Sequence, residues 1–299
     1  MAPAFKKFLQ RNALPEQYLE SARTWLNPVA HSLEETRDRN RCLIVGLTGC
    51  QGSGKSTVAD YLKTFLSVRM QLRVCVLSID DFYFPLEKRL QMAREQHPLF
   101  KVRGVPGTHD CRLLADILDQ LTSREKQPVH VPLFSKRDDD RTPESEWLEV
   151  ETPIDILILE GWCVGLTPQA PAALELATND LEQYEDPTAQ WRTTVNQALA
   201  GEYQLLFERI DSLIYLAAPS FNSVYSWRLE QEQKLRLQQG HGGKALMDKG
   251  QIDRFIKFYQ RLTEHGLATL PKKANHFFKL GDQREIVSYR APGQQKSSL

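Results

Sequence analysis

The chain has 299 residues, of which 41% are hydrophobic and 25% are charged, and its formal net charge is zero. This composition is that of an ordinary globular protein, and the length suits one large α/β domain or two small ones. Because positive and negative charges balance, we expect neither nucleic acid nor a membrane among its partners.

Five cysteines occur without the paired spacing of a metal site, at Cys42, Cys50, Cys75, Cys111 and Cys163. Their odd number predicts neither a disulfide framework nor a zinc site, and it favours a reducing compartment. No apolar run approaches the roughly 18 residues of a membrane span, and the N-terminus lacks the apolar core of a signal peptide. We therefore expect a cytoplasmic protein, either a monomer or a homodimer.

The predicted organisation is a helical extension over residues 1–41, a main domain over 42–290 and a flexible tail over 291–299. In the extension, apolar residues from Leu14 to Leu26 share one helical face, with Pro15 near a helix start. The charged stretch 31–41 is interpreted as a linker. A short apolar run at 43–47 then predicts the first buried strand.

Strands and helices alternate along the main domain. Further strands are predicted at 74–77, 129–133, 154–159 and 213–217, a hairpin at 277–280 and 286–289, and helices at 58–66, 113–121, 191–208, 221–238 and 248–265. Residues 168–189, rich in proline and acids, are interpreted as an insertion at the edge of the sheet. The alternation predicts βαβ units, and hence an α/β fold of three layers, α/β/α, around a mainly parallel sheet.

The segment after the first strand matches the phosphate-binding pattern GxxxxGK[ST] at every fixed position. It comprises Gly49, Cys50, Gln51, Gly52, Ser53, Gly54, Lys55 and Ser56, with Thr57 following. Glycines let backbone N–H groups surround a phosphate, and the positive N-terminus of the next helix faces the anion. Lys55 is expected to reach the β- and γ-phosphates of ATP, and Ser56 to bind Mg²⁺. A turn that binds nothing is disfavoured by the flanking strand and helix, so the fold is predicted to be of the P-loop NTPase type.

Acidic residues follow two of the predicted strands. Asp80 and Asp81 come after the strand at 74–77, and Glu160 ends the strand at 154–159. Because ligands of open α/β sheets lie beyond the carboxyl ends of the strands, these carboxylates should face the phosphate loop. We predict that Asp80 accepts a proton and contacts the metal, that Glu160 binds Mg²⁺, and that Asp81 contacts the substrate or orients its neighbour. The alternatives are a solvated turn or helix cap for the aspartates and an edge-exposed Glu160.

Side chains in loops near these strand ends are predicted to bind the acceptor substrate: Tyr83, Arg103, His109, Asp110 and Lys136. Loops at the carboxyl edge of a sheet carry substrate groups, and an anionic acceptor needs a basic clamp. Asp110 is equally well placed as the N-cap of the next helix, His109 as a hydrogen-bonded surface residue, and Lys136 within a solvated charged loop.

A charged helix after the strand at 213–217 is predicted to be a lid over about residues 221–245. Such a lid brings an arginine onto the transferring phosphoryl group, and Arg228 is the first candidate, with Arg236 as the alternative. The predicted catalytic residues are then Lys55, Asp80, Glu160 and Arg228. An exposed helix with charge pairs at i,i+4 spacing is the other interpretation.

These motifs resemble, in the same order, those of D-glycerate 3-kinases. The matching segments are 49–56, Ser-Ile-Asp-Asp-Phe-Tyr at 78–83, Gly-Thr-His-Asp at 107–110, the stretch 132–147, Glu-Gly-Trp at 160–162 and Trp-Arg-Leu at 227–229. The resemblance implies transfer of the γ-phosphoryl group of ATP to the 3-hydroxyl of D-glycerate. It also implies a wider group with uridine, pantothenate and phosphoribulose kinases, in which the acids matching Asp80 and Glu160 serve as base and metal ligand.

Two loops depart from the plant members of that family. Residues 105–110 read Val-Pro-Gly-Thr-His-Asp in place of Asn-Ala-Gly-Ser-His-Asp, and 134–137 read Phe-Ser-Lys-Arg in place of Tyr-Asp-Lys-Ser. These loops are expected to choose the acceptor, so a kinase for a nucleoside or for pantothenate stays open. The other alternative is a nucleotide-binding regulatory protein without kinase turnover, although the sequence contains no Asn-Lys-x-Asp motif for guanine.

Overall fold

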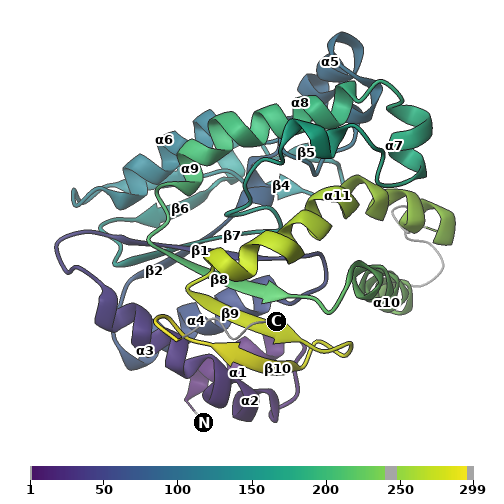
Figure 1. Cartoon of the computed structure of the whole chain (residues 1–299). Coiled ribbons are helices and arrows are strands. Elements are labelled where there is room, and N and C mark those ends of the chain that lie inside the picture. Colours follow the sequence, from purple (N-terminus) through teal and green to yellow (C-terminus); the bar gives the residue numbers. More distant parts are fainter. Residues whose placement is uncertain (1, 240–247, 295–299) are drawn as a thin grey trace.

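A six-stranded sheet in the order β10-β9-β8-β1-β7-β2 lies at the centre of the structure (Figure 1). This computed structural model describes residues 2–239 and 248–294, and the side chains of all of these except 231–239. The strands are β1 Leu43–Gly49, β2 Val74–Ser78, β7 Ile156–Gly161, β8 Ser212–Ala217, β9 His276–Leu280 and β10 Ile286–Arg290. Five of them run parallel, and β10 pairs antiparallel with β9. The predicted mainly parallel sheet and the terminal hairpin are confirmed.

Helices cover both faces of this sheet. They are α1 Pro3–Arg11, α2 Tyr18–Trp25, α3 Asn27–Thr36, α4 Lys55–Arg69, α5 Leu86–Glu95, α6 Cys111–Thr122, α7 Asp180–Glu185, α8 Gln190–Ala198, α9 Gln204–Phe207, α10 Phe221–Gln239 and α11 Lys249–Lys273. Alternate residues of β7 show the layers: Ile156 and Ile158 join the core under α1–α4, whereas Leu157 and Leu159 join the core under α6, α8 and α11. Strands buried on both faces need apolar residues throughout, which is why the sequence runs are unbroken. The three-layer architecture is confirmed.

Two small two-stranded sheets lie between α6 and β7 in the sequence. β3 Pro128–Val131 pairs with β6 Leu148–Glu151, and β4 Phe134–Ser135 pairs with β5 Asp140–Arg141. They hold the intervening loop, which carries Lys136, beside the carboxyl ends of the central strands.

The N-terminal helices pack on α4, the helix that follows the phosphate-binding pattern. The rings of Phe8 and Tyr61 meet edge to face at 5.5 Å, and the Tyr61 hydroxyl donates to Asn27 Oδ1 at 2.7 Å. The predicted linker at 31–41 is wrong for its first six residues, which belong to α3. Leu33 of this helix is fully buried, and its burial stabilises the helix despite the surrounding charges.

Helix α11 continues to Lys273, eight residues beyond its predicted end at 265. Gly266 lies inside the helix and does not end it. Glycine at this position permits close packing, because a Cβ there would lie 3.0 Å from Leu166 Cδ2. Residues 240–245 of the predicted lid and 295–299 of the predicted tail lie outside the described residues. Among the described residues, we find no helix whose length and apolar character would let it cross a bilayer.

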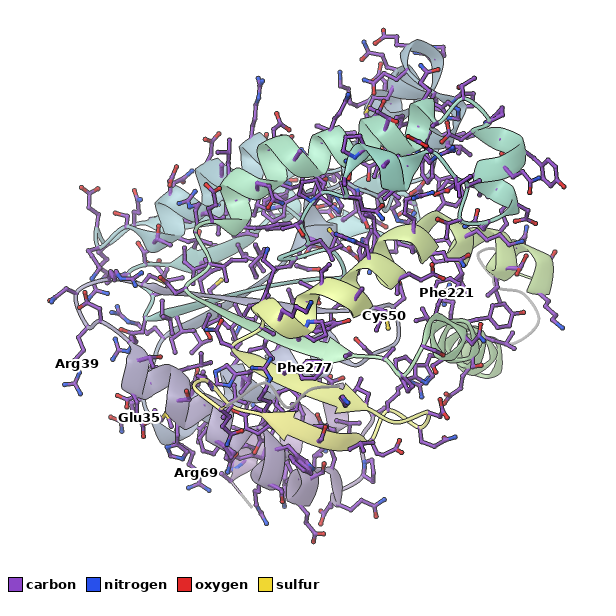
Figure 2. The ribbon with its side chains drawn as sticks, viewed as in Figure 1. Glu35, Arg39, Cys50, Arg69, Phe221 and Phe277 are labelled. Atoms are coloured by element: carbon purple, nitrogen blue, oxygen red, sulfur yellow. The ribbon has the colours of Figure 1, made fainter. Side chains whose placement is uncertain are left out.

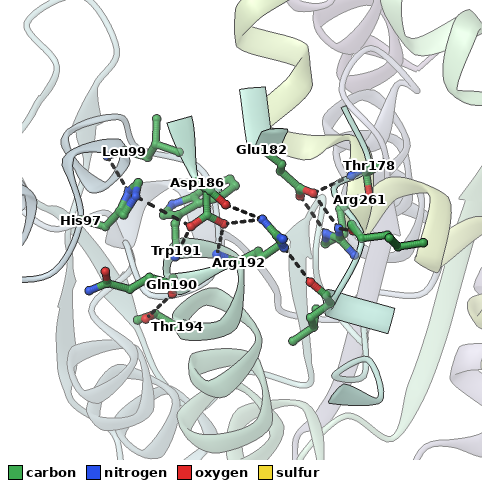
Figure 3. A network of polar contacts seen from close by, with 12 residues as sticks. His97, Leu99, Thr178, Glu182, Asp186, Gln190, Trp191, Arg192, Thr194 and Arg261 are labelled. Atoms are coloured by element: carbon green, nitrogen blue, oxygen red, sulfur yellow. Dashed lines mark hydrogen bonds and ion pairs between the residues drawn. The ribbon is translucent and has the colours of Figure 1, made fainter. Parts of the chain in front are cut away.

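The segment 168–189, predicted at the edge of the sheet, lies instead against α8 and α11. Two buried ion pairs hold it there, Asp186 with Arg192 at 3.0 Å and Glu182 with Arg261 at 2.6 Å (Figure 3). The same two arginines donate to four consecutive backbone carbonyls of the segment, from residue 173 to residue 176. The carbonyls of the stretch that precedes α7 are thereby satisfied by arginine side chains.

Candidate active site

The phosphate loop occupies the turn between β1 and α4, as the motif predicts. Gly52 and Gly54 have φ of +79° and +87°, conformations that side chains disfavour. Helix α4 begins at Lys55 without a side-chain cap in the described chain, so its first N–H groups are available to a ligand. Lys55 Nζ donates to the Cys50 carbonyl at 3.0 Å and thus lies folded over the loop.

The hydroxyl of Ser56 and the carboxylate of Glu160 meet beside this loop. β7 lies next to β1, and its last residues carry Glu160 opposite Leu47. The Ser56 hydroxyl donates to Glu160 Oε1 at 2.9 Å, although Glu160 is only 7% exposed. Hydroxyl and carboxylate oxygens are ligands that Mg²⁺ accepts, and it usually completes its shell with water and phosphate. Of the predicted metal ligands, Ser56 and Glu160 therefore lie in contact with each other.

The two aspartates after β2 have different environments. Asp80 accepts a hydrogen bond from Lys136 Nζ at 3.0 Å and another from the Tyr83 hydroxyl at 3.1 Å. Burial opposes its ionisation, but Lys136, with His109 and Lys55 adding, outweighs burial and holds the pKa of Asp80 below its usual value. Asp80 is therefore a carboxylate that stays ionised beside the phosphate loop.

Asp81 lies on the other side of this turn and holds the neighbouring loop. Its Oδ1 accepts the backbone N–H of Phe134 at 3.2 Å. Burial raises the pKa of Asp81 to about 6, and repulsion from Asp80 and Glu160 adds to the rise. Environments that push neighbouring pKa values apart give two carboxylates different tasks. The structure thus places Asp81 as a support for the β4 strand.

His109 is buried at the centre of an aromatic group. Its ring stacks on Tyr83 at 4.2 Å, and its Nδ1 lies 2.6 Å from the Tyr203 hydroxyl. Since the Tyr203 oxygen already accepts the Gly107 N–H, we assign its hydroxyl as the donor to Nδ1, which puts the ring hydrogen on Nε2. Burial lowers the pKa of His109 to about 4, so the ring is neutral near pH 7. Nε2 is buried without a hydrogen-bond partner among the described residues.

Arg103 and its neighbours hold the loop of Lys136 in place. Arg103 Nη1 pairs with Asp139, and its guanidinium lies 5.3 Å from the centre of the Phe134 ring. Asp139 also pairs with Arg89, whose side chain is fully buried. The structure therefore shows Arg103 paired with this loop, and its contact with the substrate stays a prediction.

Asp110 acts as the N-cap of α6, the alternative that the sequence left open. Its Oδ1 accepts the Leu113 N–H at 3.1 Å, and its Oδ2 lies 3.4 Å from Arg141 Nη2. A side chain that caps a helix and pairs with a partly buried arginine has a structural task.

Arg228 extends from α10 toward α11. Its guanidinium lies 5.5 Å from the centre of the Phe255 ring, and the rings of Phe255 and Tyr259 are 5.0 Å apart. Tyr259 in turn meets Trp162, two residues after Glu160, at 4.9 Å. The chain of aromatic rings connects Arg228 with the end of β7. The side chain of the alternative, Arg236, lies outside the described residues.

The structure thus gathers most of the predicted residues at one end of the sheet. Lys55, Ser56, Asp80, Asp81, Tyr83, His109, Lys136 and Glu160 contact one another or act on one another's charge. Figure 2 labels Cys50 of the phosphate loop and Phe221 at the start of α10 toward the same end of the molecule. The sequence did not predict Tyr203, which contacts His109, or Arg284, which donates to the Gly52 carbonyl.

Comparison with known proteins agrees with this geometry. No protein-family model matches the chain. The uncharacterised kinase mug58 of Schizosaccharomyces pombe is 33% identical over 81% of this chain and 87% of its own length. The probable ATP-dependent kinase TDA10 of Saccharomyces cerevisiae is 31% identical over 74% of this chain and 78% of its own. The solved structure of D-glycerate 3-kinase from Cryptococcus neoformans is 27% identical and superposes with a TM-score of 0.70 over 88% of this chain and 94% of that one.

A parallel sheet that presents a glycine-rich phosphate loop, a lysine and paired acids at its carboxyl edge defines an ATP-dependent P-loop kinase. The relatives mug58 and TDA10 are likewise named as kinases. Within this class, the chain belongs to the family of kinases that includes mug58 and TDA10.

Proposed function

We propose that the protein transfers the γ-phosphoryl group of ATP to the 3-hydroxyl of D-glycerate, giving 3-phosphoglycerate and ADP. The observation that carries the proposal is Asp80, an ionised carboxylate held by Lys136 and Tyr83 beside the phosphate loop. The likeness to a D-glycerate 3-kinase structure supports the choice of acceptor.

The chemistry needs little beyond position and charge. Asp80 accepts the proton of the acceptor hydroxyl while the oxygen forms a bond to the γ-phosphorus and the bond to the ADP oxygen breaks. Lys55 and the loop N–H groups hold the phosphates, and Arg228 approaches the transferring group from α10. Ser56 and Glu160 are the residues that would hold Mg²⁺, which when bound neutralises charge on the phosphates.

The acceptor would lie between Lys136 and His109. Lys136 is the more exposed member of its pair with Asp80, with 66% of its side chain accessible, so it can turn to the carboxylate of a hydroxy acid. The neutral His109 offers an unpaired Nε2 hydrogen to an acceptor oxygen. In this proposal Arg103 acts through the loop that it holds.

Five cysteines in the described chain are all buried and unpaired, which supports a reducing, cytoplasmic location as a further part of the proposal. Size-exclusion chromatography with light scattering distinguishes the expected monomer or homodimer from larger assemblies.

A coupled assay of ADP formation with a panel of acceptors tests the proposed substrate. D-glycerate should give the highest kcat/KM, above L-glycerate, glycolate, uridine and pantothenate. Glycolate has the same carboxylate without the 3-hydroxyl, so it tests which hydroxyl is phosphorylated. A higher kcat/KM for uridine or pantothenate would show that this compound, and not D-glycerate, is the acceptor. No turnover above the acceptor-free blank with any compound would contradict the proposed reaction.

Lys136→Met is expected to change the pH dependence of the reaction. Lys136 holds the pKa of Asp80 down, so its loss raises that pKa and moves the acid limb of the kcat/KM profile to higher pH. If Lys136 also binds the acceptor carboxylate, KM for the acceptor rises about tenfold or more. Arg137→Met, in the adjacent exposed ion pair with Asp138, is the control and should leave the profile unchanged. An unshifted acid limb in Lys136→Met would contradict the prediction.

A further inference from the structure

The turn between β9 and β10 reaches the phosphate loop. Hydrogen bonds between Gly281 N and the Glu285 carbonyl at 2.8 Å, and between Arg284 N and the Gly281 carbonyl at 2.9 Å, close this turn. Arg284 has φ of +66°, in the left-handed region that residues with side chains rarely adopt. The residue therefore holds a conformation that costs free energy and directs its side chain away from its own hairpin.

The Arg284 side chain contacts two other parts of the protein at once. Its Nε donates to the Gly52 carbonyl of the phosphate loop at 2.9 Å. Its Nη2 forms an ion pair with Glu230 of α10 at 2.6 Å, and the guanidinium lies 5.4 Å from the centre of the Trp227 ring. A planar guanidinium can make both contacts because its donors point in fixed, different directions.

The same turn fixes the first part of α10 by two further bonds. Trp227 Nε1 donates to the Asp282 carbonyl at 2.7 Å, and the Ser223 hydroxyl donates to Asp282 Oδ1 at 3.0 Å. Trp227 is 2% exposed, so its side chain is committed to this position. In Figure 1 the yellow hairpin turn and α10 lie toward the same side of the molecule as the end of β8. The position of α10 therefore depends on a turn that is also bonded to the phosphate loop.

The contact with Gly52 bears on how the loop presents its N–H groups. The carbonyl of Gly52 and the N–H of Ser53 share one trans peptide plane and point in opposite directions. While Arg284 holds the carbonyl outward, the Ser53 N–H points into the loop, where it donates to the Cys50 carbonyl at 3.3 Å. Gly52 has no side chain to resist a flip of this peptide. Arg284 is the group that opposes it.

We propose that Arg284 is a positioning residue that couples occupancy of the phosphate loop to the docking of α10. A phosphate that draws the loop N–H groups inward keeps the Gly52 carbonyl pointing outward, and so strengthens its hydrogen bond with Arg284. The better-held guanidinium in turn strengthens the contacts of Arg284 with Glu230 and Trp227. α10 carries Arg228, so the coupling links nucleotide binding to the placement of the arginine proposed for phosphoryl transfer. The inference rests on the proposed nucleotide site and adds a residue from the far end of the chain.

Calorimetric titration with Mg·ADP and hydrogen exchange of residues 221–230 test the coupling. In the wild type, Mg·ADP should slow exchange in this part of α10. Arg284→Ala should raise the Kd for ADP about tenfold and abolish the ADP-dependent slowing. Arg284→Lys retains the charge but cannot make both contacts, so it should keep the melting temperature and still lose the slowing.

Arg290→Ala is the matched control, because Arg290 lies in the same hairpin, covers the Phe277 ring and donates to backbone carbonyls away from the loop. It should retain wild-type ADP affinity and slowing. Glu230→Met removes the acceptor oxygens on the α10 side of the contact and should reduce the slowing even if Arg284→Ala fails to fold. A wild type that does not bind Mg·ADP would overturn the nucleotide site itself. Normal affinity and full slowing in the Arg284 and Glu230 variants would overturn the coupling alone.

Discussion

Replacement of Asp80 by asparagine is expected to lower kcat by about 10²–10⁴-fold while ADP binding is retained. Asparagine keeps the shape but only one acceptor oxygen, so it keeps one of the two bonds from Tyr83 and Lys136, and the amide cannot take a proton from the attacking hydroxyl. The phosphate loop does not depend on this carboxylate, so nucleotide binding should persist. Single-turnover transfer and calorimetric titration with ADP measure the two quantities separately.

Asp81→Asn is the matched comparison, because the two residues are adjacent and differ in their environment. Burial raises the pKa of Asp81 to about 6, and the amide oxygen of asparagine can still accept the Phe134 N–H. The expected loss in kcat is therefore less than about tenfold. Should Asp81→Asn abolish transfer while Asp80→Asn retains it, the assignment of the base would be wrong.

The fold follows from the sequence where apolar spacing reports burial. Strands β1, β7 and β8 of the central sheet are buried on both faces, so each is visible as a short apolar run. Helix α5 was missed for the opposite reason. Its buried residues are Arg89 and Met92, and a fully buried arginine looks like a solvent-facing residue in a hydrophobic pattern.

The site follows from the sequence where one strand end carries the chemistry. Asp80 comes soon after the end of β2, Glu160 lies in the last residues of β7, and Lys55 begins the helix after the loop that follows β1. Parallel topology brings these strand ends together. Contacts between distant segments have no such signal. Tyr203 lies 94 residues from His109, and Arg284 lies 232 residues from Gly52. Only the folded chain shows that these side chains complete the site.

The segment 168–189 shows the same limit and leads to the largest expected effect on stability. Acids and prolines in this stretch suggest an exposed insertion, yet Asp186 is fully buried and Arg192 is 4% exposed. Asp186 also accepts the N–H groups of Trp191 and Arg192 at the start of α8, at 2.8 and 3.1 Å. A hydrophobicity pattern assigns charged residues to the surface. Here Asp186 and Arg192 are buried, because each neutralises the charge of the other in the folded chain.

Arg192→Met is expected to lower the free energy of unfolding by about 3–5 kcal/mol. The substitution keeps much of the side-chain volume but leaves the Asp186 carboxylate and the Leu174 carbonyl buried without the cation that they face at 3.0 and 2.7 Å. Burying an unpaired charge costs more than the pair itself contributes, so the loss exceeds that of an ordinary surface contact. Urea titration followed by fluorescence measures the difference.

Arg11→Met provides the matched control, because Arg11 also pairs with an aspartate, Asp60, but its side chain is 57% exposed. Water can solvate Asp60 after the change, and Asn12 Nδ2 still donates to it at 2.6 Å, so the expected loss is less than about 1 kcal/mol. The contrast between the two variants isolates burial, since both remove an arginine from an arginine–aspartate pair. Equal losses in the two variants would mean that the buried network does not hold the segment against α8 and α11.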